Sequence, residues 1–476
     1  MGLVAAAAAQ EKTPEPPRES QQTALADINA RQDELNAVNK AIWEFAEVGL
    51  EERRSSALLV DKLRSAGFEI KTGVANMPTA FVASYGAGRP IIGILAEYDA
   101  LPGMSQKVDS RREPVTEGAA GHACGHSGLG TASLGAVLAV KAAMEKHGLK
   151  GTIRLYGTPA EETLIGKVYM TTAGLFNDLD VCLHWHPSTD NGASPASSKA
   201  AVSAKFTFEG TSAHASVSPH QGVSALDAVE LMNIGANFMR EHLREDARVH
   251  YVITDGGGGP NVVPATATVW YYIRANDHGD VERNFRWLQD IARGAALMTR
   301  TKMSVQIDTD CHEIIPNVPL AEALYRNLER IGPPKFTPEE HEFATRLQAP
   351  LAAEFGGDYS RTLNEDVDRL ATTPPPNKGS TDVGDISWHV PTGGLRTACF
   401  TASSPGHSWQ NVACIGSSIG EKGIKYAAQV LAATTIDLLE QPDLVKAAKA
   451  DWETRMKDRK YTSLIPEGQQ APERIR

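Results

Sequence analysis

One apolar run constrains the fold of this 476-residue chain more than any other segment: Ile91-Ile92-Gly93-Ile94-Leu95-Ala96. Apolar residues at nearly every position are typical of a strand that is buried on both faces, because an exposed face would show polar residues at every second position. A second buried strand is expected at residues 152–156, and residues 129–147 between the two have a helical pattern. Strand, helix and strand in this order predict an α/β domain with its active site at the strand ends.

The pattern changes near residue 197, where an inserted α+β unit is predicted to begin. Its elements are expected to be strands at 201–209, 250–254, 266–275 and near 305–307, with helices at 224–245 and 280–298. In the rest of the chain, helices are also expected at 28–66 and 420–439, and strands at 79–84 and 395–402. We therefore expect four segments, which are a tail at 1–23, a first catalytic part at 24–197, the inserted unit at 198–312 and a second catalytic part at 313–476.

Two interpretations of the N-terminus stay open. Leu3, Val4 and the alanines at 5–9 resemble the end of a secretory signal with its small-residue cleavage site, and a spacer rich in Pro, Glu and Ser follows at 11–23. The apolar stretch is short and no basic segment precedes it, so a plain disordered tail is the alternative. A trimmed export signal would place the protein in the periplasm or outside the cell, whereas a plain tail would leave it in the cytoplasm.

Composition argues against several classes of function. Apolar residues make up 42% of the chain and charged residues 22%, as in an ordinary globular protein. The net charge of −11 disfavours nucleic acid or an anionic membrane as the main partner. No apolar run approaches the roughly 18–20 residues that cross a bilayer. The five cysteines are scattered and odd in number, so we expect no disulfide framework.

The motif Gly121-His122-Ala123-Cys124-Gly125-His126 places a thiol and two imidazoles within a few residues of each other. Its glycines let the backbone bend tightly, so that Cys124 and His126 could face one cation. A loop with a buried cysteine and two incidental histidines is the alternative. The segments downstream favour the metal-binding interpretation.

A pair of carboxylates, Glu161-Glu162, follows the strand at 152–156. On an extended backbone, adjacent side chains point to opposite sides, so one carboxylate could bind a cation while the other handles a proton. A solvated start of a helix is the alternative. The position after a buried strand and a proline favours the functional interpretation.

Four further histidines could take part. His184 and His186 follow an apolar run at 179–182, and we expect their rings to face opposite ways, so that at most one reaches a given cation. A core histidine bonded to the backbone is the alternative for either. Small residues flank His214 and His407, which leaves each imidazole open to a ligand.

These segments together resemble the M20 metallopeptidase/amidohydrolase family over nearly the whole chain, from about Ala24 onward. Several long motifs occur in the family's order, so chance explains the likeness poorly. The motifs are Glu97-Tyr98-Asp99-Ala100-Leu101-Pro102-Gly103, residues 121–126, Ser218-Pro219-His220 with residues 224–229, Pro260-Asn261-Val262-Val263, residues 380–388, and His407-Ser408-Trp409-Gln410.

The resemblance implies an α/β catalytic domain, with a mixed central sheet and flanking helices, that holds two divalent cations. Zn or Mn would be the metal, with Co as a third option. Cys124 would bridge the cations, because a thiolate has more than one lone pair. The terminal ligands would be His126, Glu162, His186 and His407. His186 is preferred over His184 because relatives carry one histidine here, in Trp-His-Pro, and Glu161 would be the general base.

The inserted α+β unit would be a lid and dimerisation domain. On it, His214 would hydrogen-bond the oxyanion of the reaction across a homodimer interface. Asn261 and Arg274 would hold a carboxylate of the substrate, since arginine suits a planar partner with two oxygens. An exposed strand arginine is the alternative for Arg274.

Other residues would support the site without binding a cation. Asp99 and His122 are implied to orient ligands, as is Glu97, where many relatives carry a histidine ligand. The segment Thr163-Leu164-Ile165 replaces a glycine-rich run of the relatives, which changes the wall of the pocket and leaves the preferred acyl group open.

The implied function is that of a metal-dependent amidohydrolase, which cleaves the amide bond of an N-acyl amino acid conjugate such as p-aminobenzoyl-glutamate. A metallo-dipeptidase, or a deacylase of another acyl-amino acid, is the first alternative. A non-catalytic subunit of a heteromeric hydrolase is the second, although the presence of all implied ligands and the base argues against it. The native metal, and a homodimer against a heteromer, stay open.

Overall fold

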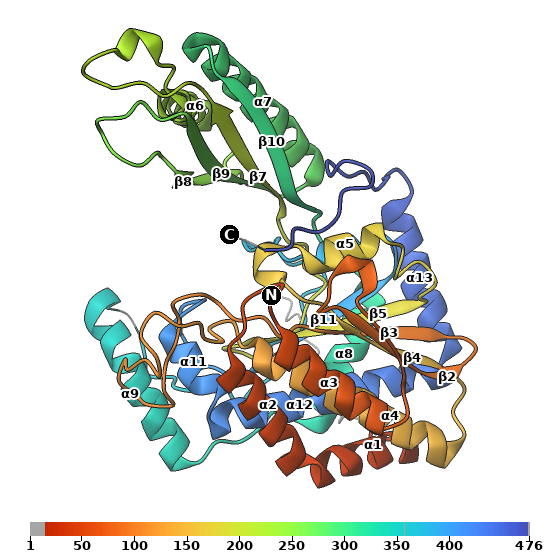
Figure 1. Ribbon diagram of the computed structural model, residues 1–476. Helices are drawn as coiled ribbons and strands as arrows, with labels where there is room; N and C mark the ends of the chain where they lie inside the picture. The colour runs from red at the N-terminus through yellow and green to blue at the C-terminus, as the bar shows by residue number, and fades with distance from the viewer. Residues whose placement is uncertain (1–14, 357, 475–476) are drawn as a thin grey trace, which may run out of the picture.

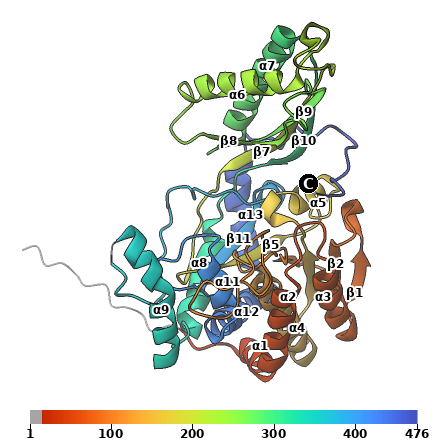
Figure 2. The ribbon, with the colours of Figure 1, turned by 60° about the vertical axis from the view of Figure 1, so that its left-hand side comes forward.

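Two β-sheets organise the computed structural model, which describes residues 15–356 and 358–474. Figures 1 and 2 show a large lower body built on a seven-stranded sheet, and a smaller upper unit, built on a four-stranded sheet, that stands away from it. The chain passes into the upper unit after β6 (Gly192–Ala193) and returns after β10 (Lys302–Cys311). The protein therefore has the mixed α/β architecture that the sequence predicts.

The seven-stranded sheet is mixed and has four parallel strands at its centre. Strands β4, β3, β5 and β11 run parallel, and β1, β2 and β6 are antiparallel to their neighbours. The strand order is β1 (Glu69–Thr72), β2 (Phe81–Ala87), β4 (Gly151–Gly157), β3 (Ile91–Ala96), β5 (Val181–Ser188), β11 (Thr392–Ala398) and β6. Parallel strands put their carboxyl ends at one edge of a sheet, so the loops that follow them meet there.

Both faces of this sheet are covered. On β3, Ile92 and Ile94 lie in one hydrophobic cluster and Leu95 lies in the other, and all three are fully buried. The helices of the first cluster are α1 (Glu19–Ala30), α2 (Gln32–Phe45), α3 (Arg53–Ser65), α4 (His126–His147), α8 (Val318–Ile331) and α12 (Ser418–Glu440). Helices α5 (Gly166–Thr172) and α10 (Val383–Ser387) contribute to the second. The apolar run at β3 is thus buried from both sides, as its sequence predicts.

The remaining helices of the body are α9 (Pro338–Phe355), α11 (Trp409–Ile415) and α13 (Pro442–Met456). Among the described residues, α4 is the one helix long and apolar enough to cross a membrane, which the sequence analysis did not anticipate. Within this helix, 89% of the most apolar window is buried inside the protein. Packing against α1, α2, α12 and the sheet accounts for its composition.

The helix expected at 28–66 is divided into α1, α2 and α3. Helix α2 ends where Ala46 takes a left-handed conformation with a φ of 44°, and Leu50 in the following turn has a φ of 68°. The turn reverses the chain, so that Glu52 at the start of α3 faces the interior of the body and is fully buried.

Helix α1 begins at Glu19, inside the segment expected to be a tail. It starts there because Arg18 forms ion pairs with Asp437 and Glu440 at the end of α12. The signal-like residues 1–14 lie outside the described residues.

The upper unit is an antiparallel sheet with two long helices. Its strand order is β10, β7 (Ala200–Glu209), β9 (Thr266–Ala275) and β8 (Arg248–Asp255). Helices α6 (Ala225–Arg240) and α7 (His278–Thr299) bury Met232 and Phe285 in a core with Phe206 of β7. Helix α6 ends at Arg240, five residues before the end that the sequence predicts.

A buried cluster of polar rings holds the return from the upper unit to the body. His278, at the start of α7, shares a hydrogen bond of 2.8 Å with Asp310, and its ring stacks on that of His312 with centroids 3.7 Å apart. Tyr461 also stacks on His312, at 4.3 Å, and donates to Asp385 of α10 at 2.8 Å. These contacts join the upper unit, the returning chain, α10 and the C-terminal segment.

We expect the stability of this junction to depend on pH through His278. Burial opposes charge on the ring, but the hydrogen bond and the charge of Asp310 outweigh it and raise the pKa of His278. A raised folded-state pKa adds stability that is complete below the unfolded-state pKa of about 6.5 and is lost as the pH rises through the folded-state value. His278→Gln should therefore lower the free energy of unfolding, measured by urea denaturation, more at about pH 6 than at about pH 9.

His220→Gln is the matched control, because His220 is an exposed histidine of the same unit. Its effect should stay within about 0.5 kcal/mol at both pH values. Equal losses of stability for His278→Gln at the two pH values would contradict the expected linkage.

Candidate active site

Side chains that can bind a metal ion gather at the carboxyl edge of the four parallel strands. They are Glu97 and Asp99 after β3, Glu161 and Glu162 after β4, His186 on β5, Cys124 and His126 at the start of α4, and His407 in the loop after β11. Segments far apart in the sequence therefore meet at the edge where the α/β pattern predicts an active site.

A glycine turn brings Cys124 and His126 together. Gly125 has a φ of 85°, and a side chain there would come within 3.0 Å of Pro187, so only glycine fits. The turn leaves Cys124 Sγ 3.3 Å from His186 Nε2 and starts α4 at His126. The Cys/His motif thus forms a corner at which a thiol and imidazoles meet.

Three groups of side chains have potential ligand atoms that lie within 4.8 Å of one another. They are Cys124–His126–His186, Cys124–Glu162–His407 and Glu97–His126–Glu161. Cys124 belongs to the first two groups, so its sulfur lies between a pair of imidazoles and a carboxylate–imidazole pair.

The separations within these groups fit donors to a common cation. Metal–ligand distances of about 2.0–2.3 Å place two adjacent donors of one tetrahedral or octahedral ion roughly 3.0–3.5 Å apart. Three pairs are each separated by 3.3 Å: Cys124 Sγ and His186 Nε2, His126 Nε2 and Glu97 Oε2, and His407 Nε2 and Glu162 Oε2.

Hydrogen bonds determine which nitrogen each buried imidazole presents to these groups. His126 Nδ1 donates to Asp99 at 2.8 Å, and His186 Nδ1 donates to the carbonyl oxygen of Pro187 at 2.6 Å. The Nε2 atom of each ring is therefore left as an electron-pair donor. Metal-binding histidines are commonly oriented in this way.

Three buried polar atoms of the site make no hydrogen bond to any residue that the structure describes. They are His126 Nε2, Glu97 Oε2 and Glu162 Oε1. Buried polar atoms are normally paired, so a cluster of unpaired ones indicates a missing partner. All three are electron-pair donors, which fits a cation as that partner.

The site also concentrates buried groups that are negative when ionised. Burial, aided by the charge of Glu97, raises the pKa of Glu161 well above its usual range, and burial raises the pKa of Glu162 to about 7. Burial and the neighbouring Glu162 raise the pKa of the Cys124 thiol. A bound divalent cation reverses these shifts, because it stabilises the thiolate and carboxylate forms. The donor set therefore fits divalent cations.

Glu161 and Glu162 lie in a 3₁₀ turn, η2 (Glu161–Thr163), so the extended backbone expected from the sequence is wrong. The turn still separates the two carboxylates. Glu161 Oε2 lies 3.9 Å from His126 Nε2, whereas Glu162 Oε2 lies 3.3 Å from His407 Nε2. The two side chains can thus have different roles.

Glu52 supports this turn, and the sequence analysis missed it. Its buried carboxylate accepts the N–H of Ala160 at 2.8 Å and the hydroxyl of Thr79 at 3.0 Å. Ala160 has a φ of 56°, which starts η2, and the N–H of Glu162 donates to Asp99 at 2.9 Å. Burial raises the pKa of Glu52 to about 8. Nothing local in the sequence links Glu52 to a turn so far along the chain.

His184 and His186 lie on the same face of β5, so the expectation that their rings face opposite ways is wrong. Side chains alternate along a strand, and residues two apart therefore share a face. Gly394 on the neighbouring β11 makes room for His184, because a Cβ there would lie 2.2 Å from the ring. In the described chain, His184 belongs to none of the three groups.

His122 connects the Cys/His motif to α2. Its Nε2 donates to the carbonyl oxygen of Ile42 at 3.0 Å, and burial lowers the pKa of the ring to about 4. His122 is thus a neutral buried histidine, outside the three groups of ligand atoms found in the described chain.

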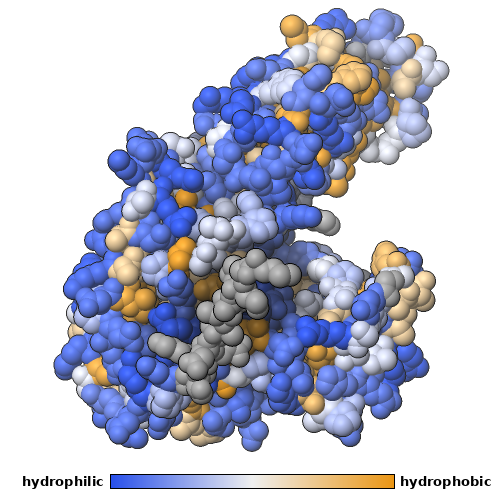
Figure 3. Space-filling view, turned by 180° about the vertical axis from the view of Figure 1, so that it is seen from behind, coloured by the Kyte–Doolittle hydropathy of each residue, from blue (hydrophilic) through white to orange (hydrophobic). Residues whose placement is uncertain are grey.

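A cavity of about 340 Å³ opens beside the three groups. Its lining includes Cys124, Glu161, Glu162, His184, His186, His407 and, from the upper unit, Arg274. Seen from behind in Figure 3, the surface is hollowed between the body and the upper unit. Arg274 Nη1 donates to Ser380 at 3.3 Å, while its buried Nε has no hydrogen-bond partner in the described residues. An arginine with unused donors thus faces the cavity.

His214 and Asn261 lie elsewhere on the upper unit. Both are exposed, and neither is among the described residues that line the cavity. His214 Nδ1 accepts the N–H groups of Ser216 and Val217, each at 3.2 Å. Of the three substrate contacts expected from this unit, Arg274 is the one that reaches the cavity within a single chain.

Lys167 is a second residue that the sequence analysis missed. It is fully buried on α5, with Nζ 2.8 Å from Glu97 Oε1 and 2.6 Å from Asp382 Oδ1. Burial opposes its charge, yet Asp382 and Glu97 outweigh burial and raise the pKa of Lys167. A lysine within the apolar stretch Leu164-Ile165-Gly166-Lys167-Val168 is the signal that could have revealed it.

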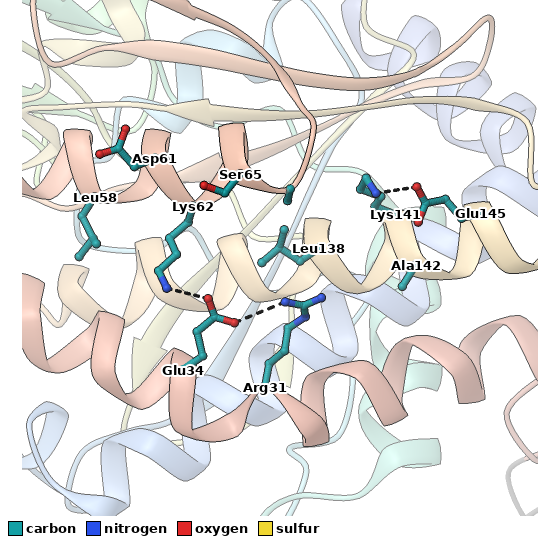
Figure 4. Close-up of a pocket in the computed structure, with 11 residues that line it drawn as sticks. Arg31, Glu34, Leu58, Asp61, Lys62, Ser65, Leu138, Lys141, Ala142 and Glu145 are labelled. Atoms are coloured by element: carbon teal, nitrogen blue, oxygen red, sulfur yellow. Dashed lines mark hydrogen bonds and ion pairs between the residues drawn. The ribbon is translucent and has the colours of Figure 1, made fainter.

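A separate cavity of about 470 Å³ lies between α2, α3 and α4, near the end of α4 opposite to His126. Figure 4 shows its charged groups paired with one another, with Glu34 at 2.7 Å from Lys62 and 3.4 Å from Arg31. None of the metal-binding groups found in the described residues lies there. We therefore place the active site at the strand ends.

Comparison with known sequences agrees with this placement. Residues 93–434 match the peptidase family M20/M25/M40. The chain is 40% identical over 461 residues to one of the two polypeptides of the p-aminobenzoyl-glutamate hydrolase of Escherichia coli (strain K12), covering 92% of this chain and 96% of the relative. It is 28% identical over 451 residues to the Xaa-Arg dipeptidase of Mus musculus, covering 90% of this chain and 91% of the relative.

Solved structures share the fold. An aminobenzoyl-glutamate utilization protein from Klebsiella pneumoniae superposes with a TM-score of 0.57 at 18% identity, covering 85% of this chain and 96% of that one. The Bacillus subtilis YXEP protein, described as a dinuclear metal binding peptidase from the M20 family, gives 0.53 at 16% identity, covering 87% and 99%. At these identities the likeness shows the fold alone, and the sequence matches show the family. The chain is a hydrolase that belongs to the peptidase family M20/M25/M40.

Proposed function

We propose that this chain uses two divalent cations to cleave the amide bond of an N-acyl amino acid conjugate such as p-aminobenzoyl-glutamate. One observation carries the proposal: the Cys124 sulfur belongs to two adjacent groups of ligand atoms, with the buried Glu161 carboxylate beside them. The relatives support it, since one that is 40% identical is named as part of a p-aminobenzoyl-glutamate hydrolase, while a structural neighbour is described as a dinuclear metal binding peptidase.

In this proposal Cys124 bridges the two cations. His126 and His186 hold one, and Glu162 and His407 hold the other. Thiolate and imidazole donors suit Zn²⁺, whereas the carboxylate leaves room for Mn²⁺ or Co²⁺. When bound, the cations would acidify a water molecule and polarise the carbonyl group of the substrate.

Glu161 is proposed to move the proton. Its buried side chain lies beside His126 and lines the cavity. The carboxylate takes a proton from the attacking water and delivers it to the amine nitrogen that leaves when the C–N bond breaks. The burial that raises the pKa of Glu161 helps it to hold the proton between these two steps.

Arg274 is the proposed anchor for a carboxylate of the substrate. It reaches the cavity from β9, and its Nε lacks a partner in the part of the chain that the structure describes. A guanidinium binds a planar carboxylate through two parallel hydrogen bonds. The amino acid half of an acylated glutamate offers such a group.

We propose that residues 198–312 form a lid and dimerisation domain. Strand β8 is an edge strand that exposes Val252 and Ile253, which favours pairing with a second copy of the chain. In such a homodimer, His214 and Asn261 would face the cavity of the other copy, where His214 would stabilise the oxyanion. A monomeric mass by sedimentation would contradict this arrangement.

Two alternatives remain in view. A dipeptidase is the second candidate function, because a relative at 28% identity is named Xaa-Arg dipeptidase. A heteromer is the alternative assembly, because two differently named polypeptides of the Escherichia coli p-aminobenzoyl-glutamate hydrolase are relatives of this chain, at 40% and 27% identity.

Activity profiling after loading with Zn²⁺, Mn²⁺ or Co²⁺ tests the substrate class. We expect kcat/KM for p-aminobenzoyl-glutamate to exceed that for Xaa-Arg dipeptides by at least about 100-fold, or roughly 2.7 kcal/mol in transition-state binding. Removal of the metal with a chelator should abolish turnover. The reverse preference would make the chain a dipeptidase, and no turnover of either substrate by the metal-loaded chain would favour a non-catalytic role in a heteromer.

Glu161→Gln should lower kcat by about 100- to 10,000-fold, because the amide cannot accept the proton of the attacking water. The amount of bound metal should stay near that of the wild type. Glu117→Gln, which alters an exposed loop residue, is the control and should keep full activity. Retained turnover in Glu161→Gln would rule out the proton role, and joint loss of metal and activity would indicate a ligand instead.

Arg274→Ala should raise KM for substrates with a free carboxylate by about 10- to 100-fold, since a charged hydrogen-bonded pair contributes roughly 1.5–3 kcal/mol. For the matching carboxamide substrates, the variant and the wild type should differ little. Equal losses with both kinds of substrate would show that Arg274 maintains the fold rather than recognises the carboxylate.

A further inference from the structure

We infer that Glu97 binds the same cation as His126, as a fourth protein ligand that Lys167 holds in place. This inference rests on the two-cation site proposed above. The family resemblance implies only a supporting role for Glu97, whereas the contacts of its carboxylate place one oxygen among the ligand atoms.

The Glu97 carboxylate is buried inside the metal-binding region. Glu97 follows β3 directly, and its side chain is 4% exposed. Its Oε2 lies 3.3 Å from His126 Nε2, and Glu161 Oε2 lies 3.9 Å from the same nitrogen. A separation of 3.3 Å falls within the roughly 3.0–3.4 Å expected of nitrogen and oxygen donors to one ion.

A hydrogen bond does not account for this contact. Neither His126 Nε2 nor Glu97 Oε2 makes a hydrogen bond to any described residue, although the two atoms are close. The other nitrogen of His126 already donates to Asp99. The neutral ring therefore turns a lone pair toward the lone pairs of a carboxylate, and two buried acceptors at this distance repel each other unless a cation lies between them.

Lys167 fixes one oxygen of this carboxylate and leaves the other for the cation. Its Nζ lies 2.8 Å from Glu97 Oε1 and 2.6 Å from Asp382 Oδ1, and its backbone N–H donates to Asp382 Oδ2 at 2.8 Å. These buried contacts hold Oε1 on the lysine side, so Oε2 is the oxygen that faces His126. The charge of Asp382 offsets that of Lys167, so the ammonium does not cancel the negative charge of Glu97.

The additional ligand makes the two cations unequal. One would be held by Cys124, His126, His186 and Glu97, and the other by Cys124, Glu162 and His407. A site with four protein ligands is closed, whereas a site with three keeps a position open for water or substrate. We therefore expect the cation at His407 to exchange first and the cation at His126 to be bound more tightly.

Cobalt titration of the full-length, metal-stripped protein tests the inference. The visible absorption of Co²⁺ reports its ligands, and competition with a chelator gives the affinity of each site. We expect the wild type to bind two Co²⁺, one more tightly than the other. Glu97→Gln should weaken the tighter site by at least about 100-fold and change its spectrum, while the second site stays within about threefold of the wild type.

Two further variants make the readout specific. Glu340→Gln removes another buried glutamate, which is paired with Lys422 in α12, and it should leave both affinities unchanged. Lys167→Met should weaken the tighter site by about 10-fold, because the ligand remains but loses its anchor. Should Glu97→Gln fail to fold, Glu97→Asp keeps the charge but shortens the reach, and it should weaken the same site.

Wild-type affinities and spectrum in the folded Glu97 variant would overturn the role of Glu97 and leave the two-cation proposal standing. Binding of fewer than two Co²⁺ by the wild type would overturn the two-cation proposal itself, and this inference with it.

Discussion

The burial of several acidic side chains at one edge of the sheet is the constraint on which the rest of the structure depends. Glu97, Asp99, Glu161 and Glu162 meet there because the parallel strands β3 and β4 end side by side. A buried carboxylate costs several kcal/mol unless a positive charge or hydrogen bonds accompany it. Lys167 supplies one positive charge, and the proposed cations would supply the rest.

Residues remote in the sequence meet this electrostatic demand. Glu52, at the start of α3, holds the turn before Glu161, and Asp382, from the second part of the body, holds Lys167. The two parts of the body are separated in the sequence by the whole upper unit. The site therefore joins them by ion pairs and hydrogen bonds as well as by the shared sheet, and a change in either part can reach the site.

Sequence reasoning predicted the features that depend on local order. The apolar strand at β3 and the glycine turn before His126 could be recognised because a few adjacent residues determine each of them. The pairing of Lys167 with Glu97 could not, because it depends on how α5 packs against β3. The rings of His184 and His186 were expected on opposite sides although a strand repeats every two residues, so that error lay in the reasoning and not in the sequence.

The position of the substrate-binding residues depends on a still larger scale. Arg274 lies on β9 close to the body, where the chain alone determines its place. His214 and Asn261 lie in loops of the upper unit, and their place relative to a cavity depends on the lid and on any second copy of the chain. No local pattern in one sequence determines such an arrangement.

The upper unit leaves and rejoins the body at one point. Strands β7 and β10 are antiparallel neighbours, with Ala201 opposite Cys311 in the ladder. Because neighbouring strands lie about 5 Å apart, a short turn could replace the whole unit without stretching the body. The unit is thus an exchangeable module: evolution or design can resize it, and so reshape the upper wall of the cavity, while the edge that carries the metal ligands stays the same.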